Sequence, residues 1–258
     1  MGYVISIANQ KGGVGKTTTA VNLSASLAAG KKPCLLIDSD PQGNATSGLG
    51  ISRSGLEKGL YDLLVGDLSA EEVITKTAQS RLQLIGATRN LIGAEVELMR
   101  MDKKEYRLRN HLADLKMKYD YIFIDSPPSL GFLTINALVA SDLVLIPLQC
   151  EYYALDGMSQ LLKTLKAVKK SLNPALKLAG IILTMYDKRN NLSRQVEDEV
   201  RSHFNRIVFK TVVPRNVRLS EAPSHGKPIV LYDIRSKGAQ SYLSLAKELI
   251  NLERNKKG

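Results

Sequence analysis

The sequence predicts an α/β fold built on a single doubly wound, mostly parallel sheet flanked by helices. Short, fully apolar runs such as Cys34–Ile37 and Leu143–Ile146 are typical of strands that are buried on both faces of a parallel sheet. Helix-patterned segments separate these runs, as crossovers between parallel strands require. The chain has 258 residues, 44% of them hydrophobic, so it can bury one large core. We therefore expect residues 1–258 to form one domain, with a loose C-terminal tail at 254–258.

Composition restricts the partners and the kinds of site. The net charge of +11 favours a polyanionic partner, either nucleic acid or an acidic membrane surface. The two cysteines, Cys34 and Cys150, lie far apart in or beside apolar runs and are expected to be reduced core thiols. The sequence has no CxxC pair, which argues against a zinc or iron–sulfur site.

The chain opens on a strand-like run instead of a signal peptide, which predicts a cytoplasmic protein. The stretch nearest to a membrane span, 130–149, is interrupted by Asn136, Asp142 and Pro147. A buried helix followed by a buried strand is therefore expected there.

A glycine-rich segment follows the first expected strand, Tyr3–Ala8. Residues 10–18 read QKGGVGKTT, and a helix is expected from about Thr18 to Ala29. Backbone N–H groups and the positive end of the helix dipole would surround an anion with several oxygens. Lys16 would reach the β- and γ-phosphates of a nucleotide, and Thr17 would ligate Mg²⁺. A glycine turn without a ligand is the alternative, but strand, glycines, Lys-Thr and helix occur in the required order.

This segment departs from the common pattern G-x-x-x-x-G-K-[ST]. Gln10 stands at the first glycine position, and an additional lysine, Lys11, precedes the glycine pair.

Two expected strands end in acidic residues. The run Cys34–Ile37 leads to Asp38 and Asp40, and the run 121–124 leads to Asp125. Because ligands of open α/β sheets bind at the carboxyl ends of the strands, these carboxylates should lie beside the phosphate-binding loop. Asp125 matches the acid that holds Mg²⁺, directly or through water, in P-loop nucleotidases. The alternative is that it caps the next helix.

The remaining elements follow from hydrophobic periodicity and turn residues. A turn and mobile loop are expected at Pro41–Asn44, and a polar, weakly helical region at 51–78. The lysines at 163, 166, 169 and 170 spread over one solvated side of a helix, which favours solubility before DNA contact. The other expected elements are strands at 82–86, 178–183 and 207–213, helices at 90–101, 105–117, 153–170, 190–204 and about 239–252, and a loop at 214–224 with two arginines.

Four motifs together resemble the ParA family of DNA-partitioning ATPases, and in particular its small chromosomal, Soj-like branch. They are KGGVGKTTT, LLIDSDPQGNAT, YIFIDSPPS and VPRNVRLSEAPSHGKP, and the similarity extends over about residues 3–250. The resemblance implies a P-loop NTPase of the deviant Walker A type that hydrolyses ATP with Mg²⁺ and forms an ATP-dependent sandwich homodimer. It further implies that the dimer binds double-stranded DNA nonspecifically on the nucleoid and is released when a ParB-like partner stimulates hydrolysis.

The resemblance also implies roles for individual residues. It assigns Lys11 to the partner protomer's phosphates, Asp40 to the attacking water and Asp125 to the Mg²⁺ shell. Lys16 in cis and Lys11 in trans would then place two cations where charge develops on the γ-phosphate. DNA contact falls to Arg189 and Arg218, for which a solvated surface arginine is the alternative. The ATP-binding positions are Lys11, Gly12, Gly13, Val14, Gly15, Lys16, Thr17 and Thr18 in the loop, with Met185, Pro214 and Asn216 near the adenine.

Two other classes share the P-loop. A MinD-like membrane-surface ATPase that positions cell-division proteins needs a C-terminal amphipathic anchor with large apolar residues. Here the last residues are NLERNKKG, with no Phe or Trp, so no membrane contact is expected. An iron–sulfur carrier or nitrogenase-reductase relative would need cysteines that the sequence lacks. No helix-turn-helix extension precedes the P-loop, so operator-specific repression is not expected.

Overall fold

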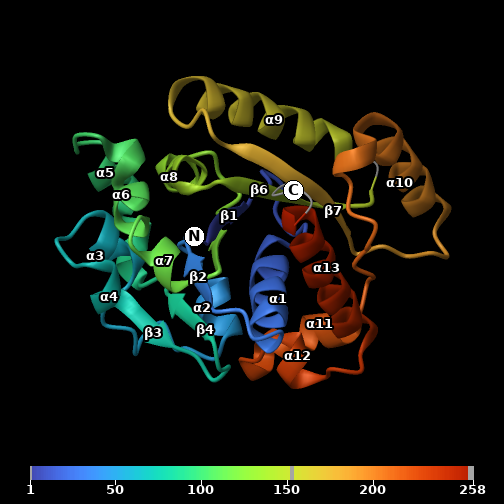
Figure 1. The fold of residues 1–258 in the computed structure, drawn as a ribbon, viewed down its shortest axis with the longest axis horizontal. Coiled ribbons are helices and arrows are strands. Elements are labelled where there is room, and N and C mark those ends of the chain that lie inside the picture. Colours follow the sequence, from blue (N-terminus) through green and yellow to red (C-terminus); the bar gives the residue numbers. More distant parts are fainter. Residues whose placement is uncertain (1, 152–153, 255–258) are drawn as a thin grey trace.

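Residues 2–151 and 154–254 are described by the computed structural model, and within them seven strands form one sheet (Figure 1). The strand order is β3-β4-β2-β5-β1-β6-β7; β3 runs antiparallel to β4, and the other neighbouring pairs are parallel. This arrangement confirms the predicted fold class. The strands are β1 (Tyr3–Ile7), β2 (Cys34–Asp38), β3 (Ile74–Lys76), β4 (Leu82–Ile85), β5 (Tyr121–Asp125), β6 (Leu143–Gln149) and β7 (Lys177–Thr184).

The strands are apolar throughout because both faces of the sheet are covered. In β1, Ile5 and Ile7 pack into the cluster on one face, whereas Val4 packs into the cluster on the other. The same alternation holds in β5, where Phe123 and Ile122 belong to opposite clusters. Successive side chains of a strand point to opposite faces, so a central strand needs apolar residues at every position.

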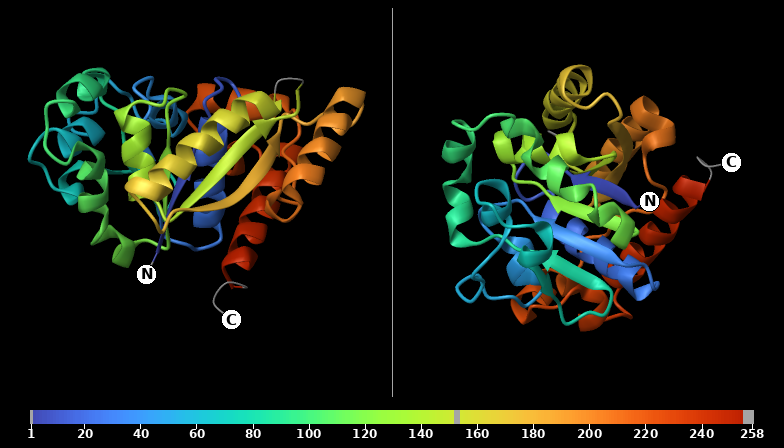
Figure 2. Two further views of the ribbon diagram at one scale, coloured as in Figure 1. Left: turned by 90° about the horizontal axis from the view of Figure 1, so that it is seen from above. Right: turned by 60° about the vertical axis from the view of Figure 1, so that its left-hand side comes forward.

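Helices cover the two faces in two groups (Figures 1 and 2). On one face, α1 (Lys16–Ala29) packs against α13 (Lys237–Arg254), and the Thr19 and Tyr242 hydroxyls are 3.2 Å apart in the buried contact. Helices α1 (Lys16–Ala29), α2 (Asn44–Gly48), α11 (Val217–Glu221), α12 (Ile229–Tyr232) and α13 (Lys237–Arg254) lie on this face. The opposite face carries α3 (Leu60–Leu64), α4 (Ala70–Val73), α5 (Ala94–Leu98), α6 (Arg107–Leu112), α7 (Leu115–Lys118), α8 (Phe132–Ala140), α9 (Ala154–Ser171) and α10 (Asn191–Phe204).

The parallel strands all end at the same edge of the sheet. In the left panel of Figure 2 the strand arrows point upward, while β1 begins and α13 ends on the lower side. The upper edge therefore collects the loops that follow β1, β2, β5, β6 and β7. In doubly wound sheets this edge binds the ligand.

Two helices predicted between β4 and β5 are broken into short pieces. The segment 90–101 divides into a 3₁₀ turn, Arg89–Ile92, and α5, and the segment 105–117 divides into a 3₁₀ turn at 104–106, α6 and α7. A distant side chain contributes to the second break. Asn136 of α8 accepts a hydrogen bond from the Leu108 N–H (3.1 Å) and donates one to the Lys104 carbonyl (2.8 Å). These backbone groups bond to α8 instead of continuing one helix.

The strand predicted at 207–213 is wrong. Two isolated bridges join this region to β7 and its end, Ile181 with Val208 and Tyr186 with Pro214, and the Phe209 and Val213 N–H groups donate to the Ile181 and Leu183 carbonyls. The Lys210 and Thr211 N–H groups instead donate to the Glu248 carboxylate of α13, at 2.6 and 3.0 Å. Between the two contacts with β7 the backbone therefore bonds to α13, and no continuous ladder with β7 forms.

Other boundaries shift slightly. The predicted loop at 214–224 contains α11 and a 3₁₀ turn, Ala222–His225, and β3 lies in a region predicted only as weakly helical. Helix α1 begins at Lys16, two residues earlier than predicted, and the four lysines of α9 are exposed as expected. The predicted start of α9 at Tyr153 lies outside the described residues. Helix α13 extends to Arg254, and the rest of the predicted loose tail, 255–258, lies outside them too. That the whole chain forms one domain stays a prediction.

Stretch 130–149 forms α8 and β6, as expected. Within the described ranges no helix has the length and apolar character that crossing a membrane requires.

Candidate nucleotide-binding site

The glycine-rich loop lies between β1 and α1 at the edge where the strands end. Gly13 and Gly15 have φ angles of 74° and 89°, a left-handed conformation that strains any residue with a side chain. A Cβ on Gly12 or Gly13 would meet no atom within 4 Å, so this side of the loop faces open space. The loop turns directly into α1, whose 14 residues direct their positive dipole end at that space.

Two polar side chains outside the motif anchor the loop. Asn9 donates to the Pro147 carbonyl of β6 (2.7 Å) and accepts from the Lys11 N–H (3.0 Å). Thr184, the last residue of β7, donates to the Val14 carbonyl (2.8 Å). Neither residue was predicted from the sequence, although each is a polar residue at the end of an expected strand.

The two motif lysines point to different places. Lys16 is buried, and its Nζ donates to the Lys11 carbonyl (2.8 Å) at the base of the loop. Burial lowers the pKa of Lys16, and the nearby Asp125 and Asp40 oppose that shift. The Lys11 side chain instead forms an ion pair with Glu151, in the loop after β6.

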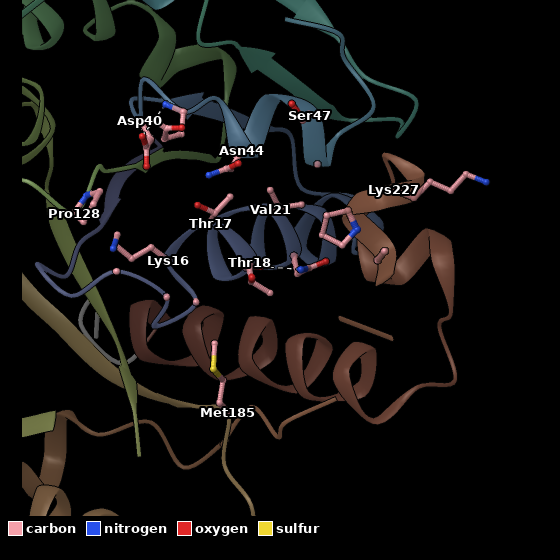
Figure 3. Close-up of a pocket in the computed structure, with 18 residues that line it drawn as sticks. Lys16, Thr17, Thr18, Val21, Asp40, Asn44, Ser47, Pro128, Met185 and Lys227 are labelled. Atoms are coloured by element: carbon pink, nitrogen blue, oxygen red, sulfur yellow. Dashed lines mark hydrogen bonds between the residues drawn. The ribbon is translucent and has the colours of Figure 1, made fainter. Parts of the chain in front are cut away.

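A cavity of about 530 Å³ opens above the loop (Figure 3). Its volume falls within the range of small-molecule sites. Lys16, Thr17 and Thr18 of α1 lie on one side of it and Asp40 on the other, with Met185 at the lower end of the view. The lining residues are Gly12, Gly13, Gly15, Lys16, Thr17, Thr18, Val21, Asn22, Asp40, Gln42, Asn44, Ser47, Gly48, Pro128, Met185, Ala222, Pro223 and Lys227.

Two predicted adenine contacts lie near the cavity but do not line it. Pro214 pairs in a parallel bridge with Tyr186, next to Met185, and Asn216 caps α11 by accepting from the Leu219 N–H (3.3 Å). The far end of the cavity is closed instead by the segment 222–227. The Asn22 side chain holds that segment, since its Oδ1 accepts from the Ile229 N–H (2.7 Å).

The two acids after β2 have different environments. Asp38 is fully buried; its Oδ2 accepts from the Thr46 N–H (2.7 Å) and hydroxyl (2.6 Å). Burial raises the pKa of Asp38 to about 6, although the two bonds from Thr46 lower it. Asp40 lines the cavity, and its Oδ1 accepts from the Gln42 N–H (2.9 Å). Asp38 therefore holds the start of α2, and Asp40 faces the cavity.

Asp125 is a buried carboxylate without a hydrogen-bond partner of good geometry among the described residues. Burial and the charge of Asp38 raise its pKa well above the ordinary value, and the nearby Thr17 hydroxyl and Lys16 oppose that shift. A buried carboxylate without donors needs a counter-charge. Oxygen ligands are those that Mg²⁺ prefers, so Asp125 and Thr17 fit a magnesium ion at this point. Within the described ranges no cluster of three or more His, Cys, Asp or Glu side chains could hold a metal by itself.

The predicted DNA-contacting arginines lie on neighbouring segments. Arg189, in the loop after β7, has a side chain 91% exposed and pairs with Asp187 (Nη2–Oδ2, 3.1 Å). Arg218, in α11, pairs with Glu221 (Nη1–Oε2, 2.9 Å). The Arg215 N–H donates to the Tyr186 carbonyl (3.1 Å), which holds the two segments side by side.

Comparison with known proteins agrees with this geometry. The family described as "AAA domain" matches residues 2–178. The chromosome partitioning protein ParA of Myxococcus xanthus is 58% identical over 250 residues, which cover 97% of this chain and 88% of that protein. The sporulation initiation inhibitor protein Soj of Bacillus subtilis is 59% identical over 249 residues, covering 96% and 98%. The chain belongs to the ParA family.

Solved structures place the ParA fold among nucleotide-binding proteins. A cobyrinic acid a,c-diamide synthase from Mycobacterium smegmatis, solved with bound ADP and magnesium, matches with a TM-score of 0.87 and 36% identity, covering 98% of this chain and 96% of that one. The septum site-determining protein MinD from Pyrococcus horikoshii, complexed with Mg-ADP, matches with a TM-score of 0.81 and 27% identity, covering 98% of each chain. In this ParA-family chain the cavity, the P-loop and the buried Asp125 occupy one edge of the sheet.

Proposed function

We propose that this protein is a chromosome- or plasmid-partitioning ATPase that binds ATP with Mg²⁺, dimerises on ATP and binds DNA nonspecifically as the dimer. The observation that carries the proposal is Asp125. Its carboxylate is buried beside Thr17 and Lys16, has no hydrogen-bond partner of good geometry among the described residues, and lies under a cavity large enough for a nucleotide. Nucleotide and Mg²⁺ in the two solved relatives support this assignment.

In the proposed reaction, water attacks the γ-phosphorus, the bond to the β–γ bridging oxygen breaks, and ADP and phosphate leave. Mg²⁺, when bound, neutralises charge on the β- and γ-phosphate oxygens. Thr17 and Asp125 would hold the ion. Lys16 lies at the first position of α1, where its ammonium can move from the Lys11 carbonyl to the phosphates. Asp40 faces the cavity and would orient the attacking water.

Dimerisation follows from the second lysine. Lys11 pairs with Glu151 in the isolated chain, and this pair is about one-third exposed. An exposed pair of this kind is weak, so the phosphates of a nucleotide held by a second protomer can compete for Lys11. ATP would then join two protomers, and loss of the γ-phosphate would weaken the contact.

The basic surface at Arg189 and Arg218 supports DNA binding through phosphate contacts. Arg189 pairs with Asp187, and Arg218 pairs with Glu221 and with Asp233 (Nε–Oδ2, 3.7 Å), so a DNA phosphate competes with these carboxylates. Each protomer alone offers few contacts, and a dimer doubles them. Phosphate contacts carry no sequence information and weaken steeply with salt. A ParB-like partner that stimulates hydrolysis would release the dimer from the nucleoid; this partner is inferred from the partitioning names of the relatives.

The test is retardation of unrelated DNA fragments with ATP, ADP or a slowly hydrolysed analogue, over a salt titration. We expect retardation with ATP and the analogue only, lost as salt rises. Arg218→Glu should abolish it, whereas Arg100→Glu should not, because Arg100 is an exposed arginine just beyond α5 and makes the same charge change. Equal binding with ADP and ATP would refute the cycle. Binding to anionic liposomes but not to DNA would favour a membrane-surface ATPase instead.

A further inference from the structure

Arg53 makes an unusual set of contacts in the segment between α2 and α3. Its guanidinium donates to the carbonyl oxygens of Pro41 (Nη2, 2.6 Å), Gln42 (Nη1, 2.8 Å) and Ala87 (Nε, 3.2 Å). Pro41 and Gln42 directly follow Asp40, and Ala87 lies just after the end of β4. One side chain therefore ties the loop of the cavity-facing acid to the sheet.

The turn after Asp40 packs directly on this guanidinium. The Gly43 N–H donates to the Asp40 carbonyl (2.9 Å), which closes a tight turn, and Gly43 has a φ of 67°. A Cβ on Gly43 would lie 2.3 Å from the Nε of Arg53. The turn and the guanidinium are therefore in direct contact, with no room for a side chain at position 43.

The bonds are of the strong kind. An arginine presents five donors in a rigid planar fork, and a charged donor roughly doubles the strength of a hydrogen bond to a carbonyl. Lysine, with one rotating ammonium, cannot span the carbonyls of Pro41, Gln42 and Ala87 in the same geometry. Neither these three bonds nor a longer one from Nη2 to the Thr88 carbonyl (3.5 Å) reaches the P-loop or the residues that would hold Mg²⁺.

We infer that Arg53 is a positioning residue for ATP hydrolysis: it fixes the Asp40 turn so that the Asp40 carboxylate faces the cavity. The inference rests on the proposed ATPase function and on the water-orienting role proposed for Asp40. A small displacement of a group that orients the nucleophile costs much rate. Nucleotide affinity depends on the P-loop instead, so the loss should fall on kcat and leave KM nearly unchanged.

The test compares Arg53→Ala and Arg53→Lys with Arg89→Ala in the full-length protein, with phosphate release as the assay. Arg89 is an exposed arginine on the same shallow groove, so it is a matched control. We expect Arg53→Ala to lower kcat by about 10- to 100-fold with a KM change below about twofold. Arg53→Lys should be intermediate, Arg89→Ala should match the wild type, and millimolar guanidinium should restore part of the Arg53→Ala rate.

Hydrogen exchange without nucleotide separates this inference from the proposed function. The amides of residues 40–46 should exchange faster in Arg53→Ala than in the wild type or Arg89→Ala, whether or not the protein hydrolyses ATP. A wild type without ATPase activity would refute the proposed function, while the exchange experiment would still test whether Arg53 holds the Asp40 turn. Unchanged exchange, or unchanged kcat in Arg53→Ala beside an active wild type, overturns the inference. A lower kcat together with a higher KM and a lower melting temperature, without guanidinium rescue, also overturns it, since that pattern indicates a general structural role.

Discussion

Replacing Thr46 with valine should destabilise the protein by removing hydrogen bonds, because the two side chains have almost the same shape. Thr46 is fully buried in α2, between the ends of β2 and β4. Its hydroxyl donates to Asp38 Oδ2 (2.6 Å) and accepts from the Ala87 N–H (3.0 Å). Valine fills the same volume without the oxygen, so both partners lose a bond.

The size of the effect follows from the two lost bonds. A hydrogen bond to a charged group contributes about 1.5–3 kcal/mol, and a buried N–H left without a partner costs about 1–3 kcal/mol. We therefore expect Thr46→Val to lower the free energy of unfolding by about 3–5 kcal/mol near neutral pH. The Thr46 N–H still donates to Asp38, so the carboxylate is not left entirely without donors.

Urea unfolding followed by circular dichroism measures this free energy, and Thr46→Ser is the matched control. Serine keeps the hydroxyl and removes one buried methyl group, which costs about 1 kcal/mol. The hydrogen-bond argument thus predicts that valine costs more than serine. If serine costs more, or if valine costs less than about 1 kcal/mol, packing decides the position and the reasoning is wrong.

Three further predictions concern the site and the thiols. Asp40→Ala should bind ATP normally but hydrolyse it at least about 100-fold more slowly. A nucleotide-binding titration and a phosphate-release assay measure the two properties, and normal turnover would remove Asp40 from the mechanism. Glu151→Gln should dimerise with ATP at a protein concentration up to about fivefold lower than the wild type, because an exposed ion pair is worth at most about 1 kcal/mol, and Lys11→Ala should stay monomeric. Monomer–dimer ratios from sedimentation in the analytical ultracentrifuge test this, and a Lys11→Ala dimer would contradict the role of Lys11 in the partner's site. Burial raises the pKa of the Cys150 thiol to about 12. The thiol therefore stays protonated at pH values around 8 and should resist alkylation by iodoacetamide until urea unfolds the protein. Mass spectrometry measures the labelling, and rapid alkylation of the folded chain would count against burial.

The local sequence was enough to predict the central features of the site. Apolar runs of five or so residues predict buried strands, and glycines followed by Lys16 and Thr17 predict a phosphate loop entering a helix. These signals depend on near neighbours along the chain, so they can be recognised without the fold. The broken helix at 105–117 and the absent strand at 207–213 show the limit, because Asn136 and Glu248 bond to backbone groups of distant segments.

The sequence by itself determined that two apolar strands end in acids beside a phosphate loop, and it singled out Asp125 for Mg²⁺, but it gave Asp38 no role. Only the tertiary structure decided that Thr46 satisfies Asp38, while Asp125 is buried without a hydrogen-bond partner of good geometry among the described residues. It also decided that Arg53 holds the turn after Asp40. The physical reason is that strand and turn propensities are local, whereas the partners of a buried polar group come from whichever distant segments the strand order brings together.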